Sequence, residues 1–212
     1  MDNLATENLE KWMSFYYKNP QPDTIPVAID AFRKGGYFSQ DGSSEPIIVF
    51  LSLIFRSHPQ KIETWLSSLK EITNQENIAI GKILWLSNTE QARKYLTKIS
   101  RIKDVEIKEY LVALLKKVPP EIEKVPIASS SVIDILWAAF MATGEDKYVV
   151  RIISAFSKNN NQDELSKEMI SSMAKWSLKS NVKKHEKVKS ICLNQLKTQN
   201  EDIAIILQEI ID

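Results

Sequence analysis

Helix-ending residues recur at regular intervals along this sequence, and amphipathic segments lie between them. Asn19-Pro20, Gly35-Gly36 and Asn159-Asn160-Asn161 are three of these stops. The residue before a proline avoids the helical region, and glycine adopts the left-handed cap without strain. Between the stops, apolar residues recur every three or four positions, which is the period of an α-helix. We therefore expect an all-α protein with no β-sheet.

The stops and the apolar period together predict twelve helices. They cover residues 4–18, a short segment between 23 and 36, 47–57, 59–69, 74–86, 90–99, 104–118, 130–144, 145–158, 163–179, 183–197 and 201–211. The predicted N-caps include Asn74, Asp104 and a capping box formed by Ser87 with Glu90. The last helix carries a one-sided stripe of Ile and Leu, which indicates that it packs against the rest of the chain.

Composition narrows the class of protein further. Only 5 of the 212 residues are glycine, which argues against all-β folds and glycine-rich phosphate loops. The formal net charge of +1 provides no global attraction to nucleic acid or membrane. Apolar runs such as Ile133–Ala142 are much shorter than the ~20 residues that span a bilayer. The N-terminal segment lacks the features of a signal peptide. We expect a cytoplasmic protein, or an exported or periplasmic one if a signal peptide has been removed.

Three segments share one pattern of two apolar helices joined by a short turn. Six apolar positions mark the pattern in the first segment, and they stay apolar after a shift of thirty positions and again after a shift of a further fifty-six. These marker positions are Phe50, Leu53, Ile54, Ile62, Leu66 and Leu69 in the first segment, Ile80, Ile83, Leu84, Ala92, Leu96 and Ile99 in the second, and Leu136, Ala139, Phe140, Tyr148, Ile152 and Ala155 in the third. Such repeats stack as helical hairpins that bury their faces on one another. We therefore predict an α-solenoid-like stack, similar in construction to tetratricopeptide and HEAT repeats but without their sequence signatures.

The longest irregular stretch is the proline-containing segment 118–129. Pro119, Pro120 and Pro126 lie within it, and similar helix pairs flank it on both sides. We interpret it as a rigid connector inside one all-helical domain that spans residues 1–212.

Several segments resemble an uncharacterised family of bacterial all-helical proteins. They include LWAAFMATGE within Ile133–Phe156, NPQPDTIPVAI from Asn19 onward, and AKWSLKSN up to Asn181. The resemblance implies a helical fold and a bacterial source. It implies no reaction, so it assigns no catalytic residue.

The nucleophiles and metal ligands of the chain form no recognisable motif. The two histidines, His58 and His185, lack metal-binding spacing; His58 is expected to cap a helix and His185 to be solvated. Cys192 is the single cysteine and falls on an apolar stripe, which indicates a buried thiol. Ser129-Ser130-Ser131 lacks the glycines of a nucleophile elbow and is expected to cap a helix. We therefore predict no catalytic residue, no metal site and no cofactor.

Two groups of charged residues are weaker indications of a functional site. The pairs Glu121 with Glu123 and Glu145 with Asp146 are expected at helix starts or in loops, although a glycosidase-like pair stays an alternative. The segment Lys175–Lys197 carries seven lysines and only one glutamate. It contains no arginine, the residue that favours base reading, so we expect a solvated helix face and not a nucleic-acid site.

The architecture favours a helical-repeat scaffold that binds a protein or peptide partner. Alternatives are an enzyme without a recognisable motif, or a basic-faced module that docks on an anionic polymer or membrane surface. If the repeats stack, equivalent positions place Phe55, Trp85 and Met141 in one row along the first helix of each hairpin. We predict that this row lines the partner-binding surface.

Overall fold

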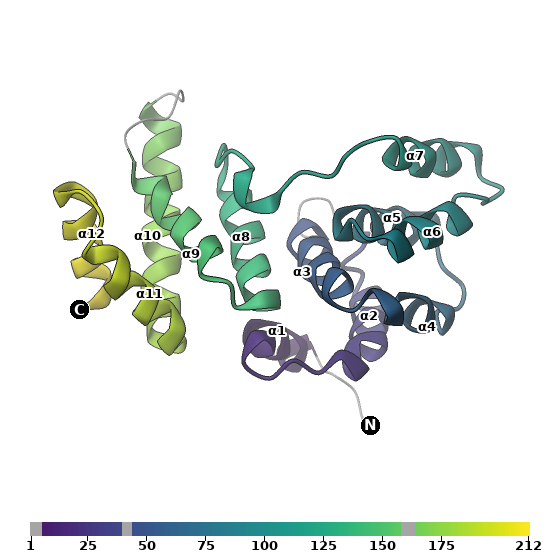
Figure 1. Ribbon diagram of the computed structural model, residues 1–212, viewed down its shortest axis with the longest axis horizontal. Helices are drawn as coiled ribbons and strands as arrows, with labels where there is room; N and C mark the ends of the chain where they lie inside the picture. The colour runs from purple at the N-terminus through teal and green to yellow at the C-terminus, as the bar shows by residue number, and fades with distance from the viewer. Residues whose placement is uncertain (1–5, 40–43, 158–163) are drawn as a thin grey trace. The chain divides into compact units, whose positions relative to one another are not determined.

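The computed structural model describes residues 6–39, 44–157 and 164–212. Across these ranges the chain forms twelve α-helices and short 3₁₀ turns without a β-strand, which confirms the all-α prediction (Figure 1). The helices are α1 (Thr6–Phe15), α2 (Ile25–Lys34), α3 (Ser44–Ser57), α4 (Ile62–Ser67), α5 (Asn74–Ser87), α6 (Glu90–Ile99), α7 (Val105–Leu115), α8 (Ser130–Thr143), α9 (Asp146–Ile153), α10 (Glu164–Lys184), α11 (Glu186–Leu196) and α12 (Glu201–Ile211). None of these described helices is long and apolar enough to cross a membrane.

The chain divides into two compact units. Unit 1 consists of residues 1–120 together with 141–144, and unit 2 consists of residues 121–140 and 145–212. The first boundary falls within the predicted connector 118–129, where a single 3₁₀ turn covers Ile122–Lys124. The grouping of all residues into one domain stays a prediction.

The centre of unit 1 is the pair of helices α3 and α5. Every residue from 47 to 55 in α3 is buried, so this helix is apolar on all sides, as expected of a helix at the centre of a core. α5 packs against α3 on one side and against α6 and α7 on others. This layering brings the ends of α5, α6 and α7 together, where the candidate site lies.

The close approach of α5 to α7 depends on Gly81. A Cβ atom at this position would lie 2.3 Å from the Cδ2 atom of Leu111, which is fully buried, so this side chain or the helix itself would have to shift. We predict that Gly81→Ala lowers the free energy of unfolding by about 1–3 kcal/mol through overpacking, although alanine favours helix by about 1 kcal/mol. Chemical denaturation monitored by circular dichroism measures this, and an unchanged or higher midpoint would contradict it.

Two of the predicted N-caps are wrong by one or two positions. Thr73, not Asn74, caps α5, because its hydroxyl accepts the free N–H of the first turn. Thr89, not Ser87, caps α6 in the same way. Asp104 caps α7 as predicted, accepting the Ile107 N–H at 3.1 Å. Neighbouring Ser, Thr and Asn side chains all suit a cap, so the local backbone decides which one is used.

Arginine side chains in unit 1 donate hydrogen bonds to main-chain oxygens at the C-terminal ends of helices. Arg56 donates to the main-chain oxygens of Leu86 at 2.7 Å and Ser87 at 3.1 Å, at the end of α5. Arg93 donates to the Leu115 oxygen at 2.8 Å, at the end of α7. The last carbonyls of a helix lack partners within it, so these bonds stabilise both the helix end and the contact between helices.

Unit 2 is organised around α10, which packs against α11 and α12. The predicted break at 179–183 is wrong, because α10 runs on to Lys184 and the chain turns at His185. His185 was expected to be solvated, but it is only 1% exposed. His185 stands between the buried residues Val182 and Val188 in the sequence. The turn therefore contains a buried position, although the lysines around it in the sequence suggest a solvated one.

The shared apolar markers of the three helix pairs lie in the cores as the period predicts. All of them are buried except Leu69 and Ile99. The turns also behave as predicted, because Asn88 and Gly144 both have positive φ angles, of 51° and 68°. These observations confirm the helix pairs but not their arrangement as a repeating stack.

Candidate functional site

The predicted row of Phe55, Trp85 and Met141 is not an accessible surface. Phe55 is 0% exposed, with its ring against that of Trp65 at 5.2 Å, and Met141 is 7% exposed. The prediction is wrong for these two residues, because their helices are covered on more than one side. Trp85 differs, because it is only partly buried and lines a pocket.

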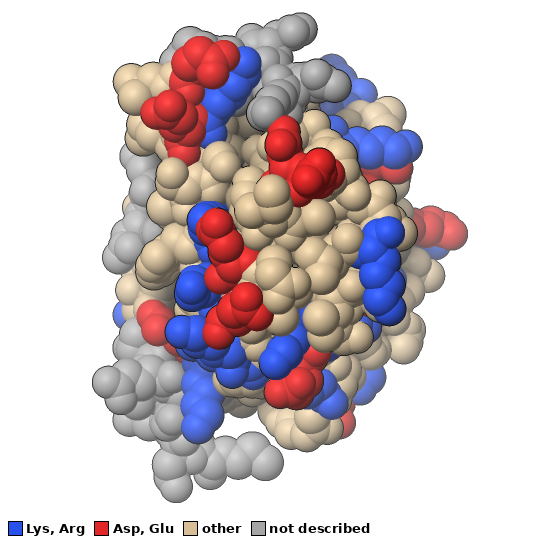
Figure 2. Space-filling model, turned by 90° about the vertical axis from the view of Figure 1, so that its left-hand side faces the viewer, with Lys and Arg blue, Asp and Glu red and all other residues tan. Residues whose placement is uncertain are grey.

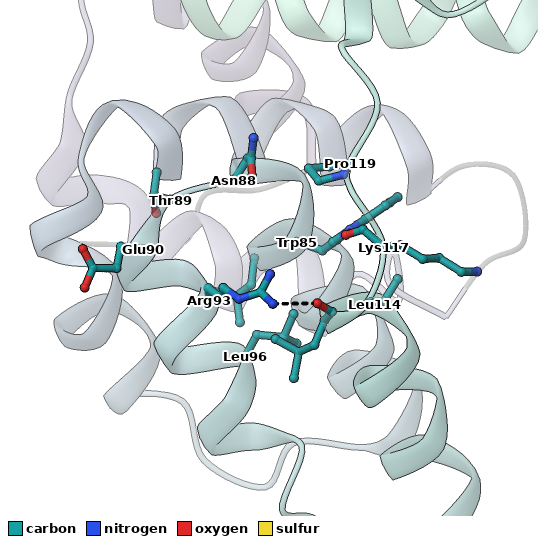
Figure 3. Close-up of a pocket in the computed structure, with 11 residues that line it drawn as sticks. Trp85, Asn88, Thr89, Glu90, Arg93, Leu96, Leu114, Lys117 and Pro119 are labelled. Atoms are coloured by element: carbon teal, nitrogen blue, oxygen red, sulfur yellow. Dashed lines mark hydrogen bonds between the residues drawn. The ribbon is translucent and has the colours of Figure 1, made fainter.

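The Trp85 pocket has a volume of about 280 Å³ and lies where α5, α6 and α7 end or begin in unit 1 (Figure 3). Leucine side chains from all three helices supply its apolar part: Leu84, Leu96, Leu114 and Leu115. Its polar part comes from the α5–α6 turn, the first turn of α6 and the segment after α7: Asn88, Thr89, Glu90, Arg93 and Lys117. The pocket is thus a small amphipathic hollow beside an indole ring.

Two hydrogen bonds fix the walls of this pocket. The indole Nε1 of Trp85 donates to the main-chain oxygen of Lys117 at 3.0 Å. The Nη2 atom of Arg93 donates to the main-chain oxygen of Leu115 at 2.8 Å, the bond dashed in Figure 3. The Leu115 oxygen belongs to the last residue of α7 and the Lys117 oxygen to the segment just after it, so the pocket side chains also hold the end of this helix in place. A ligand would therefore meet a largely pre-formed surface.

The side chains that line the pocket are suited to binding a ligand with both apolar and charged groups. Arg93 is exposed, and Figure 3 shows the side chain of Lys117 pointing away from Arg93. Of the two lining cations, the Arg93 guanidinium is thus the one that points toward the other lining side chains in Figure 3. No histidine or cysteine is among the described residues that line it. This arrangement can accept an apolar side chain together with a carboxylate.

The histidines lie away from this pocket. The Nδ1 atom of His58 is 3.2 Å from the Ile54 oxygen in the last turn of α3, in agreement with the predicted capping role. His185 is buried at the turn between α10 and α11 in unit 2. Within the described ranges, no three histidine, cysteine, aspartate or glutamate side chains are grouped to hold a metal ion.

Cys192 is fully buried in α11, which confirms the prediction of a buried thiol. Burial raises the pKa of this thiol to about 11, so the reactive thiolate is scarce near neutral pH. We predict that a thiol reagent at mildly alkaline pH leaves the folded protein unmodified and labels one thiol per chain in denaturant. Rapid labelling of the folded protein would contradict this.

The acidic pairs singled out in the sequence form ion pairs with lysines. Lys147 lies between two of these carboxylates, 3.0 Å from Glu123 and 2.8 Å from Glu145. Asp146 is 3.2 Å from Lys187, and Glu121 is 2.8 Å from Lys124. Each carboxylate thus faces a cation, which is unlike a pair of catalytic acids with one raised pKa.

The exposed face of α10 is a feature that the sequence reasoning missed. Leu165, Met169 and Trp176 expose 68%, 64% and 70% of their surface, and Met173 exposes 38%. Their i, i+4, i+8, i+11 spacing is a signal that can be read in the sequence, but periodicity alone does not distinguish an exposed apolar stripe from a buried one. The lysines of 175–197 do not form a uniform basic surface, because Lys175 pairs with Glu209 and Lys187 pairs with Asp146. On the face shown in Figure 2, acidic and basic side chains lie next to one another.

No protein-family model, no curated protein and no solved structure matches this chain. The resemblance to the bacterial helical family therefore stays a prediction, and the function must be inferred from the geometry alone.

Proposed function

We propose that this chain is a helical scaffold, built from stacked hairpins, that binds a protein or peptide partner at the Trp85 pocket. The observation that carries the proposal is the partly exposed Trp85 ring in a hollow that also presents leucines and Arg93. Tryptophan and arginine are the residues that most often dominate binding energy at protein interfaces.

The volume of the pocket and the residues that line it indicate which side chains the partner presents. Its volume of about 280 Å³ accommodates one or two side chains, not a folded domain. An apolar side chain of the partner packs on Trp85 and Leu115, and a neighbouring carboxylate binds the Arg93 guanidinium. The partner is therefore a peptide segment in which a leucine-like residue adjoins an acidic residue.

The test is selection of binders from a random peptide library displayed on phage. We expect enriched peptides to carry an apolar residue next to Asp or Glu, and Arg93→Glu to abolish their binding. Arg101→Glu is the matched control, because Arg101 is exposed and lies outside the pocket. Circular dichroism verifies that both variants are folded. Selected peptides that bind Arg93→Glu as tightly as the original protein, or no enrichment at all, would overturn the proposal.

A further inference from the structure

We infer that the exposed face of α10 is a self-association surface, on which the α10 helix of a second copy of this chain packs in antiparallel orientation. This face, here called the α10 stripe, consists of Leu165, Met169, Met173 and Trp176. The inference concerns unit 2 and is independent of the Trp85 pocket in unit 1.

The α10 stripe is a contiguous row of exposed apolar side chains. Three of its four side chains are exposed by more than half, and they follow one another along a single face of a helix of 21 residues, about 31 Å long. Single exposed apolar residues are common, but a contiguous row marks a surface that another molecule covers. Methionine adapts its shape to a partner, and tryptophan supplies a large anchor.

The charges beside the α10 stripe identify the partner as a second copy. The N-terminal end of α10 carries the exposed acids Glu164 and Glu168, of which Glu164 pairs with Lys167 of the same helix at 2.9 Å. The C-terminal end carries the exposed lysines Lys179, Lys183 and Lys184. An antiparallel copy places its lysine end against the acidic end of the first helix. Because the interface is two-fold symmetric, each favourable pairing occurs twice.

The register follows from the same pattern. When Trp176 packs near Ser172 and Met173 of the partner subunit, Met169 meets the aliphatic stem of Lys179 of the partner subunit. Leu165 then meets the stem of Lys183 of the partner subunit. Glu168 lies between these two lysine heads. A parallel pair would instead put Glu against Glu and Lys against Lys, which costs free energy. An anionic membrane would favour the lysines but oppose Glu164 and Glu168.

The experiment measures mass against concentration by sedimentation equilibrium. We expect a dimer at high concentration, and a monomer for Trp176→Glu. Leu193→Glu, at an exposed leucine on α11, is the matched control and should still dimerise. Circular dichroism checks that both remain helical.

Charge reversal tests the antiparallel register directly. Glu168→Lys and Lys183→Glu should each weaken dimerisation by about tenfold or more, since each change disturbs two symmetric pairs. The two changes combined in one chain should restore it, and the two single variants mixed should form a heterodimer. A wild-type chain that stays monomeric throughout overturns the inference, as does a combined variant no better than the single ones. So does a monomer that binds vesicles of anionic lipid through Trp176.

Discussion

Replacing Leu207 by aspartate is expected to remove about 5 kcal/mol from the free energy of unfolding. Leu207 is fully buried at the centre of α12, which packs against α10 and α11. Truncating a buried leucine costs about 2–5 kcal/mol, and an unpaired carboxylate in an apolar site adds its desolvation. This loss equals the whole stability of many single domains, so we expect unit 2 to unfold or aggregate.

The matched control is Ile205→Asp on the same helix. Ile205 is 55% exposed, so the same change of chemistry there should alter the free energy of unfolding by less than about 0.5 kcal/mol. Chemical denaturation and the helical circular dichroism signal compare the two variants. Equal effects of the two substitutions would show that α12 does not pack as the structure has it.

Arg33→Leu is expected to be the second most damaging change. Arg33 in α2 donates to both carboxylate oxygens of Glu76 in α5, at 2.9 and 3.2 Å, and the two side chains are only 11% and 10% exposed. The same guanidinium also donates to the main-chain oxygen of Lys70 at 2.9 Å. Removing one partner leaves a buried charge uncompensated, which costs about 3 kcal/mol or more. Denaturation at neutral pH measures the loss.

This effect should depend on pH with a defined sign. Burial acts to raise the pKa of Glu76, but the hydrogen bond from Arg33, the Thr73 main-chain N–H and the Arg33 charge outweigh it and lower the pKa below 4.5. A lowered pKa in the folded state contributes stability above the unfolded value of 4.5, and that contribution is lost as the pH falls through the folded pKa. The difference between the wild type and Arg33→Leu should therefore shrink in acid.

The neighbouring residue provides the control for Arg33. Lys34 lies next to it on α2, is 78% exposed and pairs with the half-buried Asp30. Lys34→Leu should change the free energy of unfolding by less than about 1 kcal/mol. A loss for Arg33→Leu no greater than that for Lys34→Leu, or a difference that does not vary with pH, would contradict the assigned role of the ion pair.

Most of the secondary structure and most of the core of this protein can be read from local patterns in its sequence. Helix stops and apolar period are local properties, so they predicted the all-α class, twelve helices, the left-handed turn at Asn88 and the burial of Cys192. The same local patterns predicted the ends of helices less exactly, because several neighbouring residues could form the cap or the break. Thr73 took the cap predicted for Asn74, and α10 continued through Lys179, because no residue there opposes a helix.

Which apolar faces stay uncovered depends on how the helices pack against one another. Phe55, Trp85 and Trp176 look alike as aromatic residues on amphipathic helices, yet one is buried, one lines a pocket and one projects from the surface. The difference depends on which helices pack on each face, and those contacts join residues that are far apart in the sequence. The Arg33–Glu76 pair spans 43 positions for the same reason. Periodicity tells which side of a helix is apolar, but the packing of other helices determines whether that side becomes core or binding surface.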